Sequence, residues 1–156
     1  MSTHIDLVER HPVRVAYRRY TGPLGQPLNR FWRAQVAPWL AEMGLLDCPR
    51  YGVALDNPGT TAPEKCRYDC CVELPAGLSL ADSPESTIAG GQFAVTRFKG
   101  TGAEIGAAWD EFVGACTARN LPFDPSRPAF EFYPRGASFD AKTGVFSCEL
   151  CYPVGS

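Results

Sequence analysis

The chain of 156 residues is 45% hydrophobic, so it is long enough and apolar enough to bury the core of one domain. Its 15 lysines and arginines nearly balance 17 aspartates and glutamates, and no basic block is present, which argues against direct nucleic acid binding. No apolar run is long enough to cross a membrane and the N-terminus has no signal-peptide core, so we expect one cytoplasmic domain over residues 1–156.

The first predicted elements are a strand and a helix. Alternating apolar residues predict a strand over 13–17, and apolar residues at helical spacing predict a helix over 28–43 that ends at Gly44. Pro38 lies inside this helix, where it removes a backbone donor and clashes with the preceding turn. A kink or break is therefore expected near Val36.

A pair of strands and a linker follow. Residues 50–55 and 66–74 have the composition of strands, and the Asp-Asn-Pro-Gly sequence at 56–59 between them is typical of a turn. Residues 75–84 read PAGLSLADSP and are expected to link the two halves of the chain.

The second half repeats the order strand, helix, strand, strand. Gly90 and Gly91 precede its first strand and indicate a bulge or a close backbone approach. Thr101 and Glu104 form a capping-box pattern before an amphipathic helix over 105–116. The strands of this half are expected at 92–98, 130–134 and 145–153.

Short sequence segments recur in the two halves in the same order. Three pairs of segments match at a nearly constant spacing: 16–22 with 94–100, 49–51 with 128–130, and 68–70 with 148–150. A predicted helix that contains tryptophan follows the first match in each half. These ordered matches indicate an internal duplication, and chance similarity between two α+β segments is the alternative.

The duplication predicts a fold class and a place for a ligand. One β-α-β-β unit has a single helix over a small sheet and leaves a marginal core, whereas two units can join their sheets. We therefore expect an α+β domain with pseudo-two-fold symmetry, in which two main helices and an antiparallel sheet surround a central groove. The modules are expected at about 11–75 and 86–154, and pockets favour such joins.

The motifs of common enzymes and metal sites are weak or missing in the sequence. Both histidines, His4 and His11, precede the first predicted strand, and no glycine-rich phosphate loop is present. Cys148 and Cys151 are spaced as a CxxC pair, but residues three apart on a strand point to opposite faces. Buried, reduced thiols are therefore favoured over a zinc pair, and we expect no metal and no cofactor.

Two strand glutamates are candidates for a ligand's counter-charge. Glu131 shares a strand face with Tyr133, and Glu149 shares one with Cys151. A buried carboxylate needs a cation or hydrogen-bond donors, or it stays protonated; a solvent-facing or ion-paired glutamate is the alternative. Gly52 matches Glu131 in the other half, so the acid breaks the symmetry, as binding sites often do. The aromatic residues expected on the pocket walls are Tyr17, Tyr51, Tyr68, Trp109 and Tyr133.

These residues also resemble a known family. The sequence LDNPGTTAPEKCRYD at 55–69 looks like the D-(N/D)-P-x-x-T-P-x-E-x-x-R-x-D signature of the GyrI-like small-molecule-binding domains. The resemblance runs from about Val13 to Val154. Four further segments are similar to the family's second half: GGQFAV at 90–95, WDEF at 109–112, PAFEFY at 128–133 and CELCYP at 148–153.

The resemblance implies a duplicated fold whose hydrophobic groove binds small molecules. The family occurs alone in DNA gyrase inhibitory proteins and fused to DNA-binding domains in AraC- and MerR-type regulators. Multidrug-sensing relatives accept lipophilic cations on a buried glutamate ringed by aromatics, which corresponds to Glu131, and a second acid corresponds to Glu149. Cys151 stands where such regulators often have tyrosine. The chain resembles the stand-alone members, with no helix-turn-helix before Val13.

Three functions are compatible with this sequence. The leading hypothesis is a protein that binds apolar, cationic small molecules in the groove and has a regulatory or protective role. The family resemblance adds DNA gyrase as a protein partner. The alternative is a hydrolase of reactive electrophilic compounds, in which Glu131 activates water as a general base and a tyrosine donates a proton.

Overall fold

The computed structural model describes residues 3–80 and 82–155, so position 81 of the linker and the chain ends at 1–2 and 156 lie outside the described residues. The strands are β1 (Asp6–Arg10), β2 (Val13–Thr21), β3 (Arg50–Ala54), β4 (Arg67–Glu73), β5 (Glu85–Ile88), β6 (Gly91–Gly100), β7 (Phe130–Tyr133) and β8 (Phe146–Pro153). The helical segments are α1 (Gln26–Phe31), the π-helical η1 (Trp32–Val36), α2 (Ala37–Glu42), the 3₁₀-helical η2 (Pro63–Lys65) and α3 (Ile105–Ala118).

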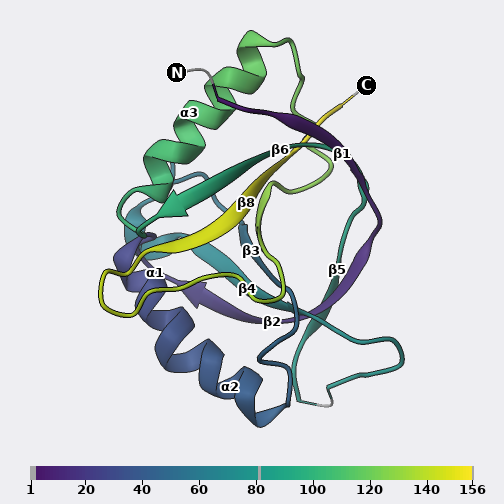
Figure 1. The fold of residues 1–156 in the computed structure, drawn as a ribbon, viewed down its shortest axis with the longest axis vertical. Helices are drawn as coiled ribbons and strands as arrows, with labels where there is room; N and C mark the ends of the chain where they lie inside the picture. Colours follow the sequence, from purple (N-terminus) through teal and green to yellow (C-terminus); the bar gives the residue numbers. More distant parts are fainter. Residues whose placement is uncertain (1–2, 81, 156) are drawn as a thin grey trace.

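Within the described residues, the strands form one antiparallel sheet whose order is symmetric about its centre (Figure 1). The order is β1-β6-β8-β7-β3-β4-β2-β5, so the second-half strands β6, β8 and β7 mirror the first-half strands β2, β4 and β3. Strands β3 and β7 therefore meet at the pseudo-two-fold axis in the middle of the sheet. This arrangement confirms the duplicated α+β fold.

Each half of the chain also contributes an edge strand to the other half. Strand β1 pairs with β6 of the second half, and β5 pairs with β2 of the first half. The sequence pattern predicts neither strand, because both are short and mostly exposed, as edge strands often are. Gly90 confirms the predicted close backbone approach, since a β-carbon there would lie 2.5 Å from the carbonyl oxygen of Arg10.

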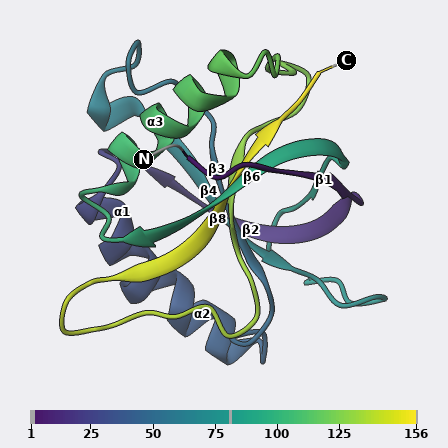
Figure 2. The same ribbon diagram turned by 45° about the horizontal axis from the view of Figure 1, so that its top comes forward.

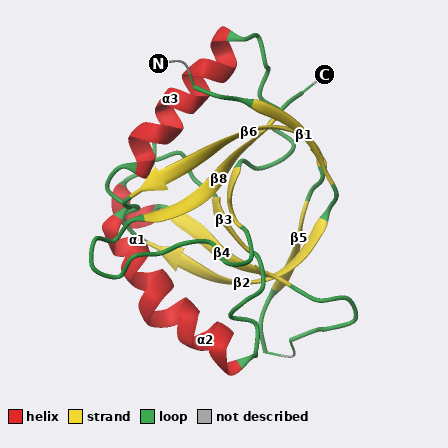
Figure 3. Cartoon of the chain, in the orientation of Figure 1, coloured by secondary structure: helices red, strands yellow, loops and turns green. Residues whose placement is uncertain are grey.

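Two helical layers lie on the same side of the sheet (Figure 3). One layer is the run α1-η1-α2, and the π-helical turn in its middle interrupts the α-helix, which confirms the predicted break near Val36. Pro38 lies in the first turn of α2, where a missing N–H is tolerated. Gly44 (φ 71°) and Asn120 (φ 59°) follow the two layers in the left-handed conformation that ends helices. No described helix is long and apolar enough to cross a membrane.

The sheet separates three hydrophobic clusters. Trp39 and Leu40 of α2 pack on the first half, and Phe112 of α3 packs on the second half. The third cluster lies on the face that carries no helix and joins both halves around Tyr51 and Cys151. Figure 2, turned by 45°, shows how the sheet curls while both helical layers stay on one side. The helix-covered face is where the candidate site lies.

Candidate functional site

The centre of the sheet places an acidic residue of one half opposite a glycine of the other. Glu131 on β7 pairs with Gly52 on β3, and their neighbours across the sheet, Leu150 and Cys70, belong to the helix-packed clusters. Paired residues share a face, so this row faces the helices. A β-carbon at Gly52 would lie only 1.6 Å from the hydroxyl oxygen of Tyr68. The missing side chain therefore makes room for Tyr68 beside Glu131.

Glu131 is buried and accepts hydrogen bonds from three neutral donors. The Tyr68 hydroxyl donates to Oε1 at 2.5 Å, the Tyr133 hydroxyl donates to Oε1 at 3.3 Å, and the Trp109 indole donates to Oε2 at 2.7 Å. Burial raises the pKa of Glu131, and the three bonds oppose this increase without cancelling it. Burial also raises the pKa values of Tyr68 and Tyr133, so both hydroxyls stay protonated at neutral pH.

Glu131 lies at the floor of a groove between the two helical layers. The groove has a volume of about 1090 Å³, and the segments that begin α1 and α3 both line it. These two segments are in contact, because a β-carbon at Gly102 would lie 2.4 Å from the side-chain nitrogen of Asn29. Such a size at the join of two modules is typical of a small-molecule pocket. The aromatic residues around Glu131 in the lining are Trp32, Tyr68, Trp109, Tyr133 and Phe146.

The charged side chains of the lining leave the groove negative. Glu131 and Asp110 line it, and neither has a cationic partner within residues 3–80 and 82–155. Asp56 also lines the groove but is ion-paired with an arginine at 3.0 Å. In the described part of the chain, Arg127 is the one cationic residue of the lining, and it forms an ion pair with Asp124 at 2.8 Å. The groove is therefore better suited to a cation than to an anion.

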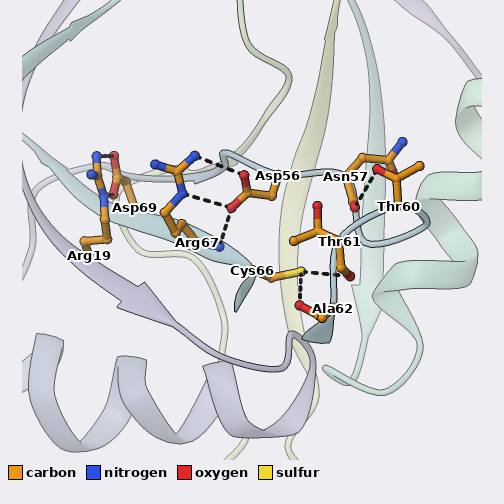
Figure 4. Close-up of polar contacts among 9 residues, drawn as sticks. All are labelled: Arg19, Asp56, Asn57, Thr60, Thr61, Ala62, Cys66, Arg67 and Asp69. Carbon is orange, nitrogen blue, oxygen red and sulfur yellow. Dashed lines mark hydrogen bonds and ion pairs between the residues drawn. The ribbon is translucent and has the colours of Figure 1, made fainter. Parts of the chain in front are cut away.

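A network of ion pairs holds the loop that forms one rim of the groove (Figure 4). Asp56 accepts two side-chain hydrogen bonds from Arg67, each at 3.0 Å, and one from the Arg67 backbone N–H at 2.8 Å. These bonds hold the pKa of Asp56 below its ordinary value. The neighbouring pair of Arg19 and Asp69 joins β2 to β4 at 2.8 and 3.1 Å. The signature at 55–69 thus positions the rim.

The chain matches a family model from residue 3 to residue 154, and that family is described as the GyrI-like small molecule binding domain. The chain belongs to this family. It is also 30% identical over 155 residues to "DNA gyrase inhibitor 1" of Dickeya dadantii (strain 3937), and the match covers 97% of this chain and 95% of that relative.

Solved structures share the GyrI-like fold at low sequence identity. The structure of SAV2435 bound to tetraphenylphosphonium has a TM-score of 0.67 and 16% identity, and covers 98% of this chain and 94% of that one. A hydrolase from Listeria innocua has a TM-score of 0.61 and 10% identity, with 99% and 93% covered. At such identities the likeness shows the fold alone.

Half of the predicted site residues lie together in the GyrI-like groove, namely Tyr68, Trp109, Glu131 and Tyr133. The others belong to the helix-free face, namely Tyr17, Tyr51, Glu149 and Cys151. Strand alternation is the reason: Tyr51 precedes Gly52, and Leu150 rather than Glu149 pairs with Glu131. The function proposed below therefore does not use these four side chains.

Trp32 and Asp110 line the groove and are among the residues that the sequence-based prediction lacks. Trp32 lies with its ring 6.5 Å from that of Tyr68 and 5.6 Å from that of Tyr133, measured between centroids. Asp110 adds a second acid to the lining that has no cationic partner among the described residues. The sequence does carry a signal for Trp32, because a tryptophan follows the matched strand in both halves and its counterpart Trp109 is a predicted wall residue. The exposed Asp110 gave no comparable signal.

The cysteines of this GyrI-like domain are free and mostly buried. Cys148 packs in the α3 cluster and Cys151 in the helix-free cluster, so their side chains lie on opposite faces of the sheet. Burial raises the pKa of Cys151 to about 12, which keeps its thiol protonated. In the described residues, no three His, Cys, Asp or Glu side chains are grouped so that they could hold a metal ion.

Proposed function

We propose that the groove captures small aromatic ligands that carry a positive charge, and that Glu131 supplies the counter-charge. The observation that carries this proposal is a buried carboxylate with three neutral donors and no cationic partner in the described chain. A ligand cation would favour the ionised form of Glu131, which burial alone disfavours. Asp110 adds negative potential to the lining of the same groove.

The walls of the groove support the same ligand class. Trp32, Tyr68, Trp109 and Tyr133 present ring faces and edges around the acid. A desolvated cation over such rings gains about 2 kcal/mol from cation–π attraction. A structural relative with the same fold binds tetraphenylphosphonium, a bulky aromatic cation, which suggests a probe for this chain.

Calorimetric titration with tetraphenylphosphonium and with neutral triphenylphosphine oxide tests the proposal. Glu131→Gln keeps the size of the side chain and removes its charge, so it should weaken phosphonium binding by about tenfold or more. Binding of the neutral oxide should change far less. Glu111→Gln is the matched control, because Glu111 is an exposed acid of α3 outside the groove lining. Equal losses for both probes in Glu131→Gln would refute the charge role.

We further propose DNA gyrase as the protein partner. The supporting observation is the 30% identity over nearly the whole chain to a relative called DNA gyrase inhibitor 1. Supercoiling by purified gyrase should slow as the purified protein is added. No inhibition at a large molar excess over gyrase would refute this partner and leave ligand binding untouched.

A hydrolase is the second candidate, and one observation favours it. The Glu131 carboxylate lies within hydrogen-bond distance of two tyrosine hydroxyls beside a groove that admits a substrate. Glu131 would take a proton from water, and a tyrosine would protonate the leaving group. Strained electrophiles should then be hydrolysed by the protein and not by Glu131→Gln. Stoichiometric binding of these compounds without turnover would refute the hydrolase and leave ligand capture as the remaining function.

A further inference from the structure

A smaller pocket lies beside the groove and shares part of its wall. Its volume is about 180 Å³, and Trp32 and Tyr133 line both spaces. The side pocket extends between α1-η1-α2 and the loop that leads from β7 to β8, where Ser138 and Phe139 complete its lining. A ligand seated on Glu131 would therefore have a second space within reach on the far side of the Tyr133 ring.

Two arginines give the side pocket a charge opposite to that of the groove. The guanidinium of Arg50 lies 6.0 Å from the centre of the Tyr133 ring, and that of Arg33 lies 5.8 Å from the centre of the Phe139 ring. Neither arginine forms an ion pair with any carboxylate in the described part of the chain. Burial lowers the pKa of Arg50, because desolvation disfavours the charged guanidinium. Arg50 is thus a half-buried cation without an ion-pair partner in residues 3–80 and 82–155.

The strand register places Arg50 and Glu131 near each other on one face of the sheet. Arg50 pairs with Tyr133, and Gly52 pairs with Glu131, so all four positions lie on one face of the sheet. Arg50 and Glu131 are diagonal neighbours, which places their α-carbons about 7–8 Å apart. Tyr133 contacts both residues, because its hydroxyl donates a hydrogen bond to Glu131 and its ring forms a cation–π contact with the Arg50 guanidinium. The two residues are therefore neighbours in the sheet, and the described part of the chain shows no ion pair between them.

We propose that the side pocket binds an oxyanion, so that the groove and the pocket together select aromatic zwitterions over simple cations. This inference rests on the function proposed for Glu131. Arginine suits a carboxylate because its planar fork donates two parallel hydrogen bonds. The Asn29 amide and the Ser138 hydroxyl, both on the pocket lining, would supply further donors. A ring with a quaternary ammonium and a carboxylate in para positions carries one charge for each of the two spaces.

The test compares phenyltrimethylammonium, 4-(trimethylammonio)benzoate and benzoate by calorimetric titration of the full chain. The zwitterion should bind about tenfold more tightly than the simple cation. Arg50→Gln should remove that advantage without weakening the binding of phenyltrimethylammonium, since the lost charge repels a cation. Arg18→Gln is the matched control, since Arg18 also stacks on an aromatic ring, that of Trp39, but lines neither space.

Arg33→Gln keeps the inference testable if Arg50→Gln fails to fold, because Arg33 is exposed. It should reduce the advantage of the zwitterion by a smaller factor. Equal affinity of the unmodified chain for the zwitterion and the cation would overturn the inference and leave the Glu131 proposal standing. Benzoate binding that depends on Arg50, with no phenyltrimethylammonium binding at all, would support the anion pocket and refute the Glu131 proposal.

Discussion

The two halves of the chain use one scaffold for different purposes at their junction. Gly52 and Glu131 occupy matching positions and pair across the pseudo-two-fold axis. The two tryptophans differ in the same way: Trp109 donates to Glu131, whereas Trp32 contributes ring surface to the groove. Duplication thus provides two similar walls, and the centre of the floor differs between the halves.

This asymmetry has a physical reason. Two carboxylates facing each other at the axis would repel, and one of them would be forced to stay protonated. Glycine opposite the acid removes that conflict and makes room for Tyr68, whose hydroxyl would collide with any β-carbon at Gly52. The pseudo-symmetric fold can therefore hold a single buried carboxylate at its axis, because the matching position in the other half is a glycine.

Adding a single methyl group at Gly52 should have the largest effect on stability and on ligand affinity. Gly52→Ala places a β-carbon on the Tyr68 hydroxyl, so Tyr68 must move away from Glu131. We expect the free energy of unfolding in urea to fall by roughly 1–3 kcal/mol, as for other overpacked cores. Phosphonium affinity should fall with it. Gly114→Ala is the control, because a β-carbon there meets nothing within 4 Å and Gly114 lies outside the groove lining. Unchanged stability in Gly52→Ala would contradict the packing described.

The two tryptophans allow the halves to be compared directly. Trp109→Phe removes the indole donor to Glu131 at 2.7 Å and should weaken phosphonium binding about tenfold, as expected for a lost bond to a charged group. Trp32→Phe keeps an aromatic ring and removes no bond to Glu131, so its effect should be several times smaller. Titration of both variants measures the difference. Equal losses would mean that the Trp109–Glu131 bond is unimportant.

The pH dependence of stability should reveal the titration of Glu131, a group that the matching Gly52 does not have. Burial raises the pKa of Glu131, so the folded chain holds a proton that the unfolded chain has already released at the same pH. Between the ordinary pKa and the raised one, stability should therefore fall as pH rises, while phosphonium affinity increases. Glu131→Gln should lack both trends. Urea denaturation and titration from acidic to neutral pH provide the measurement, and parallel curves for both proteins would contradict this assignment.

The smallest effect is expected on the opposite face of the sheet. Glu149 pairs with Phe132, away from the groove, so Glu149→Gln should leave phosphonium affinity unchanged within error. A loss as large as that of Glu131→Gln would mean that the ligand contacts the helix-free face.

Much of the fold was predictable because its signals are local. The repeated segments indicated two β-α-β-β modules, and Pro38 indicated the break in the first helical layer. Strands β1 and β5 were missed because their short, exposed sequences depend on partners in the opposite half. Such exchange between halves follows from pairing over long distances in sequence, which local patterns do not encode.

The candidate site was predictable to the same degree and for the same reason. An acid within an aromatic strand pointed to Glu131, and alternation correctly placed Tyr133 on its face. Alternation within one strand does not say which residues of another strand share that face. That information comes from the register, which puts Leu150 beside Glu131 and turns Glu149 and Tyr51 away.

Crystals grown with (4-bromophenyl)triphenylphosphonium would test the central claim most directly, because anomalous scattering from bromine locates the bound cation. We expect one site in the groove, with the phosphonium centre facing the Glu131 carboxylate and phenyl rings against Trp32 and Trp109. An ordered ligand beside Tyr51 on the helix-free face, with the groove unoccupied, would contradict the account.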